Sequence, residues 1–279
     1  MKGSLAAMLA AVKALNQAKV ELNGDILLTA VADEEYASLG TDHLVQHYHA
    51  EAAIVTEPTG MQLALAHRGF ASFEVETIGR AAHGSRYQDG IDAILLMGRF
   101  LSGLDALEQE LLGRPPHPLV GPPSIHASLI NGGTEMSTYP ASCVLMIERR
   151  NIPGETVEQA EGELRAILER CAQADPRFRA ELKTLIHRPP FVVEAEAEIV
   201  QAVTKTMTAR FGHPPVRVGA PFWTDAAILA QAGIPSVVVG PTGQGLHSAE
   251  EWVDLQSCAE FAEVLTHTAI RFCAQGEVE

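Results

Sequence analysis

The chain has 279 residues, of which 47% are hydrophobic and 20% charged, and its formal net charge at pH 7 is −15. This composition is typical of a globular protein large enough for two domains, and without an apolar run long enough to span a bilayer we expect no membrane partner. The acidic balance, with no basic stripe, excludes nucleic acid as an expected partner, because a phosphate backbone would be repelled. Four separated cysteines form no CxxC pair, and we expect a cytoplasmic protein.

The first predicted element is a helix over residues 4–19, where apolar residues recur at helical spacing. An apolar run at 26–32 then predicts a strand buried on both faces, and three carboxylates, Asp33, Glu34 and Glu35, follow where it ends. Such an acidic turn is also typical of a solvated helix start. A further strand is predicted at 52–55 and ends just before Glu57. Because ligands bind at the carboxyl edge of open α/β sheets, both strand ends are candidate sites.

The pattern changes after residue 68, where apolar and polar residues alternate as in a strand with one exposed face. The predicted elements then form the order β-α-β-β-α-β, a ferredoxin-like unit. Their ranges are a first strand around 73–77, a helix at 91–111, strands at 124–130 and 141–149, a helix at 156–172 and a strand at 181–186.

From residue 187 onward the chain returns to a helix, an apolar strand at 235–239 and a glycine-rich loop that ends at His247. The fold class is therefore α/β, a partial doubly wound domain interrupted by an inserted ferredoxin-like domain. We expect the first domain to comprise residues 1–67 and 187–279, and the inserted domain residues 68–186. The prolines at both joints are typical of hinges.

Six short motifs occur in the order and approximate spacing of one family: AVADEE with Glu34 and Glu35, VTEPT with Glu57, GRAAHGS with His83, INGG with Asn131, WTDAA with Asp225, and GLHSAEE with His247. The chain resembles the M20 metallopeptidases, which include acetylornithine deacetylase and succinyl-diaminopimelate desuccinylase. The resemblance implies a catalytic α/β domain that holds two Zn²⁺ or Co²⁺ ions. It also implies an inserted dimerisation domain, a homodimer, and an N-acyl amino acid or small peptide as substrate.

The resemblance assigns roles to four residues of the predicted catalytic domain. Glu34 matches the general base, Glu57 a ligand of the first metal, and Glu35 and His247 ligands of the second metal. Carboxylate and imidazole groups suit zinc or cobalt, and a bound divalent ion lowers the pKa of water to about 7. A single histidine in a glycine-rich loop is also typical of a structural residue. The loop at 240–245 is in addition compatible with a phosphate cradle, although it lacks the lysine of a P-loop.

Each of the remaining candidate residues has a possible functional role and an ordinary structural alternative. His83 matches the residue that polarises the scissile carbonyl across the dimer, but a surface histidine is the ordinary alternative. Asn131 matches a residue near the substrate, or belongs to a hairpin turn. Arg149 and Arg150 are candidates to bind a substrate carboxylate, with Arg150 preferred, or lie solvated at a strand end. Asp225 is interpreted as a helix cap outside the metal site.

Two family features are missing from the sequence. The family has an HxD motif on an early strand and a bridging Asp immediately before a Met-Lys-Gly that corresponds to Met1-Lys2-Gly3. The chain is therefore expected to be truncated at an internal methionine and to bind at most about one zinc weakly, since closed sites need three or four protein ligands. The alternative function is a non-catalytic dimerisation or small-molecule-binding protein that retains a degenerate metal site.

Overall fold

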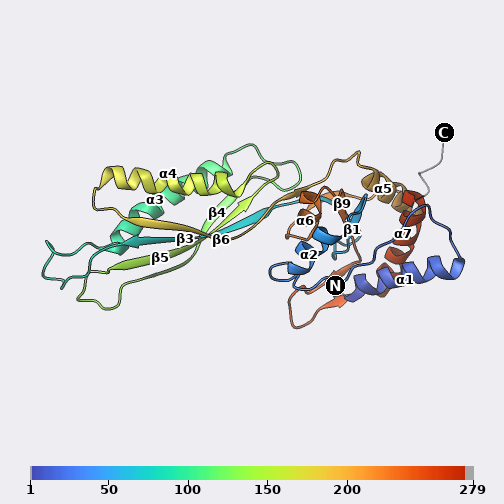
Figure 1. The fold of residues 1–279 in the computed structure, drawn as a ribbon, viewed down its shortest axis with the longest axis horizontal. Helices are drawn as coiled ribbons and strands as arrows, with labels where there is room; N and C mark the ends of the chain where they lie inside the picture. Colours follow the sequence, from blue (N-terminus) through green and yellow to red (C-terminus); the bar gives the residue numbers. More distant parts are fainter. Residues whose placement is uncertain (1, 274–279) are drawn as a thin grey trace. The chain divides into compact units, whose positions relative to one another are not determined.

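A computed structural model describes residues 2–273, which form two compact units (Figure 1). The first unit comprises residues 2–67 and 191–273, and the second unit comprises residues 68–190. The joint predicted after residue 186 falls within β6 (Ala180–Arg188), which continues almost to the observed joint. No helix among the described residues has the length and apolar character needed to cross a membrane.

The first unit is built on a mixed sheet with the strand order β1-β9-β2-β7, in which β8 also pairs with β2. Its strands are β1 (Ala53–Val55), β2 (Leu63–His67), β7 (Phe191–Val192), β8 (Arg217–Ala220) and β9 (Ser236–Val238). The β1–β9 and β2–β8 pairs are parallel, whereas β2 is antiparallel to both β7 and β9. The predicted α/β character is therefore present, but the sheet is not wholly parallel.

Helices cover both faces of this sheet because its strands are apolar on both sides. The helices α1 (Lys2–Ala18), α5 (Glu198–Phe211) and α7 (Leu255–Cys273) pack on the face that carries Leu63 and Leu65. Their core also includes Ala7, Val200, Val203, Val237, Val239, Phe261 and Val264. The helix α6 (Ala226–Gln231) packs on the opposite face, and α2 (Leu39–His47) packs against α6 (Figure 1).

The strand predicted at 26–32 is wrong. These residues belong to no strand, and Ile26 and Leu27 are exposed. An apolar run becomes a strand only when a neighbouring strand satisfies its backbone groups, and no strand in the described part of the chain pairs with this one. The apolar composition therefore predicted buried side chains, but the described residues do not cover Ile26 and Leu27.

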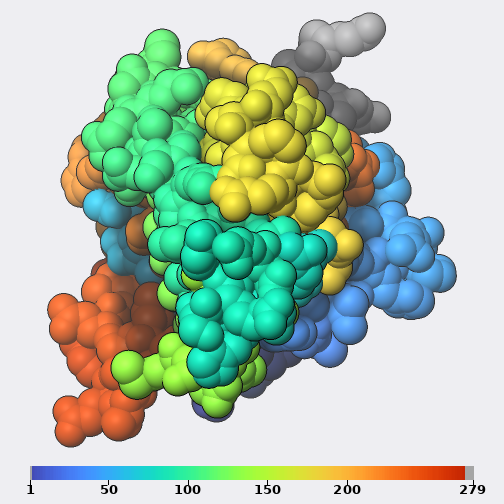
Figure 2. Space-filling view, turned by 90° about the vertical axis from the view of Figure 1, so that its left-hand side faces the viewer, coloured from blue at the N-terminus to red at the C-terminus, as the bar shows by residue number. Residues whose placement is uncertain are grey.

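The second unit has an antiparallel sheet in the order β4-β5-β3-β6. Its strands besides β6 are β3 (Gly69–Ile78), β4 (Ser124–Gly132) and β5 (Ser142–Asn151). The helices α3 (Ala93–Leu112) and α4 (Val157–Ala174) lie side by side against it, with α4 in yellow in Figure 2. The element order β-α-β-β-α-β follows the periodicity of the sequence and is that of a ferredoxin-like unit. The buried residues of β3 alternate with less buried ones, which accounts for its pattern.

Two short strands, β10 (Gly243–Gln244) and β11 (Trp252–Val253), complete the described elements. They pair antiparallel and close the glycine-rich segment into a loop. His247 lies in this loop with a φ of 59°, and Ser248 N donates to Gly245 O at 2.9 Å. The loop thus presents the imidazole outside the sheet.

Candidate metal centre

The acidic loop, defined as residues 33–38, is a tight turn held by its own backbone. The amides of Tyr36, Ala37 and Ser38 all donate to Asp33 O, at 3.2, 3.2 and 2.7 Å. Asp33 and Ser38 adopt left-handed conformations, with φ of 67° and 55°. This turn leaves Glu34 half-buried and Glu35 exposed, so adjacent carboxylates point to different surroundings.

Glu35 and His247 come together although 26–32 forms no strand. His247 Nε2 lies 3.0 Å from Glu35 Oε2, and the two side chains are 81% and 64% exposed. An ion pair this exposed contributes little stability. The arrangement does place the imidazole and carboxylate assigned to one metal within reach of a common ion.

Glu57 is the buried member of the site. It follows β1 and is 8% exposed, and its Oε1 has no hydrogen-bond partner among the described residues. The pKa of Glu57 is raised to about 8, mainly because the carboxyl group is buried and secondly because the negative charge of Glu34 lies nearby. The pKa of Glu34 is raised to about 7, mainly because of burial and then because of the negative charges of Asp225 and Glu35. The four carboxylates are therefore close enough to influence one another.

This donor set fits a divalent cation in its chemistry. A buried carboxylate oxygen without a partner is costly, and a cation beside it removes that cost. Carboxylate oxygens and an imidazole nitrogen are ligands that zinc and cobalt accept. As they stand, no three His, Cys, Asp or Glu side chains in residues 2–273 are gathered into a metal-binding group.

Asp225 does not have the capping role predicted from the sequence. It lies at the start of α6, but its side chain makes no capping hydrogen bond. It is instead 5% exposed and accepts a hydrogen bond from Thr41 Oγ1 at 2.5 Å. Nothing in the sequence pointed to Thr41, because a single threonine outside the six motifs carries no signal of its own.

The other candidates belong to the second unit. His83 is exposed, with Nδ1 2.9 Å from Ser85 Oγ. Asn131 is exposed and pairs with Val144 inside β4, so it does not form the turn of a hairpin. Arg150 forms an ion pair with Glu148. The predicted roles of His83, Asn131 and Arg150 toward a substrate stay predictions.

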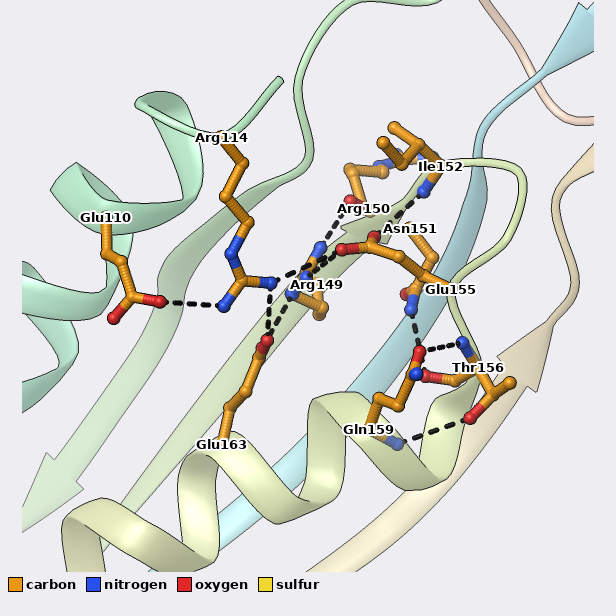
Figure 3. Close-up of polar contacts among 10 residues, drawn as sticks. All are labelled: Glu110, Arg114, Arg149, Arg150, Asn151, Ile152, Glu155, Thr156, Gln159 and Glu163. Atoms are coloured by element: carbon orange, nitrogen blue, oxygen red, sulfur yellow. Dashed lines mark hydrogen bonds and ion pairs between the residues drawn. The ribbon is translucent and has the colours of Figure 1, made fainter. Parts of the chain in front are cut away.

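Arg149 is not a solvated arginine at a strand end. Its side chain is 1% exposed and forms ion pairs with Glu155 at 3.0 Å and Glu163 at 3.4 Å (Figure 3). Arg114 joins the same carboxylates from the end of α3, at 2.7 Å from Glu163. The network ties β5, α3 and α4 together, and its buried guanidinium is unavailable to a substrate. Arg149 and Arg150 differ because successive residues of a strand face opposite sides.

The chain thus combines a mixed sheet that has helices on both faces with an inserted β-α-β-β-α-β unit, and it places four acidic residues, Glu34, Glu35, Glu57 and Asp225, near one another in the first unit. The chain belongs to peptidase family M20/M25/M40, whose sequence model matches residues 1–271. This confirms the family resemblance seen in the motifs.

Curated relatives and solved structures agree with this assignment. The chain is 29% identical over 258 residues to the acetylornithine deacetylase of Myxococcus xanthus, covering 91% of this chain and 66% of the relative. It is 26% identical over 300 residues to an N-formyl-4-amino-5-aminomethyl-2-methylpyrimidine deformylase of Bacillus subtilis, covering 99% and 70%. The chain thus spans about two thirds of the length of the curated relatives it matches.

Two solved structures share the fold. The aminopeptidase PepT of Bacillus cereus superposes with a TM-score of 0.82 at 18% identity, covering 98% of this chain and 71% of that one. The YXEP protein of Bacillus subtilis, described as a dinuclear metal binding peptidase from the M20 family, gives a TM-score of 0.74 at 19% identity, covering 96% and 71%.

Proposed function

We propose that the protein is a metal-dependent hydrolase of amide bonds in N-acyl amino acids or small peptides. The observation that carries the proposal is the approach of Glu35 and His247, at 3.0 Å, beside the acidic loop that bears Glu34. Family membership supports it, as do relatives named as a deacetylase and a deformylase.

Glu35, Glu57 and His247 would hold the divalent ion, zinc or cobalt, with room for two ions in a complete ligand set. A bound ion would supply water of lowered pKa as the nucleophile. Glu34 would accept the proton of that water and deliver it to the leaving amine. A positioned carboxylate is one of the side chains that serve as a general base.

The second unit would provide substrate contacts and a dimer interface. His83 would polarise the scissile carbonyl, and Asn131 and Arg150 would contact the substrate. The edge strand β4 exposes Leu129 and Ile130, and an unpaired strand edge favours pairing with a second copy. We therefore propose a homodimer formed through this unit.

One observation favours the second candidate, a non-catalytic dimerisation or small-molecule-binding protein. The potential ligands among the described residues are not gathered as a set of three. A protein of this kind would keep the second unit and bind metal weakly without turnover.

Hydrolysis assays distinguish these candidates. The substrates are N-acetyl, N-succinyl and N-formyl amino acids, each assayed with added Zn²⁺ or Co²⁺ and with a chelator. We expect metal-dependent hydrolysis that is lost in Glu34→Gln and kept in Glu21→Gln, which alters an exposed carboxylate of the same unit. Absence of hydrolysis across the panel with either metal would favour the non-catalytic candidate.

A further inference from the structure

We propose that Thr41 and Asp225 form a positioning pair, which holds the acidic loop in the shape that presents Glu34 and Glu35. The family resemblance assigns neither residue a role, and Asp225 does not form the helix cap that the sequence predicted. The consequence for metal binding rests on the proposed function, whereas the positioning itself does not.

Backbone hydrogen bonds close the turn of the acidic loop, but its left-handed residues call for further support from outside the loop. Asp33 and Ser38, at its two ends, hold left-handed conformations that residues other than glycine rarely adopt. Such backbone strain persists only where the surroundings over-determine it. Ser38 is buried, whereas Glu35 and Tyr36 at the tip of the loop are exposed and supply no packing.

The two ends of the loop are drawn together by a close backbone approach. Gly40 N donates to Ala32 O at 3.1 Å, and a Cβ on Gly40 would lie 2.5 Å from Ala32 N. The first turn of α2 therefore cannot move away from Ala32 without breaking this backbone contact. The position of the first turn of α2 thus determines the shape of the loop.

Thr41 fixes that first turn. It is 2% exposed, and its hydroxyl donates to Asp225 Oδ2 at 2.5 Å across a separation of 184 residues. Hydrogen bonds to a carboxylate are stronger than those between neutral groups, particularly where water is excluded. The bond links α2 to α6, which pack against each other.

Asp225 is itself held by the sheet. The preceding residue, Thr224, donates its backbone amide to Nε2 of the buried His67 at 3.2 Å. The hydroxyl of Thr224 also accepts from Ala226 N at 3.3 Å. A continuous series of contacts therefore runs from β2 through α6 and α2 to the acidic loop, all within the first unit.

Hydrogen–deuterium exchange of the metal-free protein tests the pair. Thr41→Val keeps the shape of the side chain and removes the donor, and we expect the loop amides, including Ser38 and Gly40, to exchange about tenfold faster. Thr41→Ser restores the donor and should restore slow exchange. The matched control is Thr268→Val in α7, a buried threonine whose hydroxyl has no partner among the described residues, and it should leave the loop unchanged.

Two results would overturn the proposal. One is loop exchange in Thr41→Val at the wild-type rate. The other is acceleration spread equally over the first unit, which would indicate general loss of stability. If Thr41→Val does not fold, Asp225→Ala, which removes the acceptor from the other side, is measured in the same way and must give the same local acceleration.

A second test measures Co²⁺ affinity from the visible absorption spectrum of the bound ion. Thr41→Val should weaken Co²⁺ binding about tenfold, with recovery in Thr41→Ser, because outer contacts tune metal affinity by this order. A wild-type protein that binds no Co²⁺ would contradict the proposed metal site. The exchange experiment would still decide whether Thr41 and Asp225 position the loop.

Discussion

Replacing Glu57 by glutamine should remove much of the pH dependence of stability in the metal-free protein. The folded protein holds a proton on Glu57 up to its pKa of about 8, whereas the unfolded chain releases it near the ordinary value of 4.5. The unfolded state therefore binds fewer protons between these values, and the stability that Glu57 contributes below pH 4.5 is lost as the pH rises toward 8. Each pKa unit corresponds to about 1.4 kcal/mol.

The expected decrease attributable to Glu57 is about 3 kcal/mol in the free energy of unfolding between about pH 5 and about pH 8. Glu34, whose pKa is also raised, acts in the same direction. Urea unfolding of chelator-treated protein, followed by tryptophan fluorescence, measures the effect in the correct unit, because both tryptophans, Trp223 and Trp252, belong to the first unit. Glu57→Gln should show a shallower decline than the wild type.

Glu21→Gln, which alters an exposed carboxylate, is the control and should decline like the wild type. The Glu57→Gln variant brings a side-chain amide into a buried position, so the comparison uses the pH slope rather than the stability at one pH. The reasoning is refuted if the wild type and Glu57→Gln have equal slopes, or if wild-type stability rises over this range.

Three further predictions concern both units. Glu34→Gln should lower kcat by about a hundredfold or more and change the zinc affinity by no more than about a few-fold, because the substitution removes the base and not a ligand. Near-normal turnover would mean that another residue takes the proton. Arg149→Leu should destabilise the second unit by about 2 kcal/mol, since it removes a buried guanidinium that pairs with Glu155 and Glu163, which keep Arg114 as a partner. Arg165→Leu, which breaks an exposed pair, should cost less than about 1 kcal/mol, and urea unfolding followed by circular dichroism separates the two variants. If His83 acts across a dimer, co-expressed His83→Ala and Glu34→Gln chains, each inactive alone, should recover at most about a quarter of wild-type activity, and tagged mixed dimers without recovery would contradict that role.

Local sequence patterns predicted the second unit well. The alternation in β3 reflects burial on one face, and this follows directly from the period of two along a strand. The helix expected from residue 91 begins at Ala93 because Asp92 caps it, accepting from Leu95 N at 3.0 Å. These features depend on neighbours a few residues away, which a sequence displays.

The errors concern features that depend on distant partners. The apolar run at 26–32 had the composition of a buried strand, but whether a strand forms depends on a neighbour that composition does not reveal. Arg149 and Arg150 look alike in sequence, and only the register of β5 decides which one is buried. Asp225 was interpreted as a cap because it precedes a predicted helix. Its actual role, as the acceptor of a hydrogen bond from Thr41, depends on a residue 184 positions away.

Isothermal titration with Zn²⁺ tests the central claim that Glu35, Glu57 and His247 hold a divalent metal. The account predicts that the chain binds about one zinc, weakly, because three protein ligands form an incomplete set for two ions. His247→Ala should weaken binding by about tenfold or more, and His213→Ala, which alters an exposed histidine of the same unit, should not. A wild-type chain that binds no zinc, an affinity unchanged in His247→Ala, or two tightly bound zinc ions per chain would contradict the account.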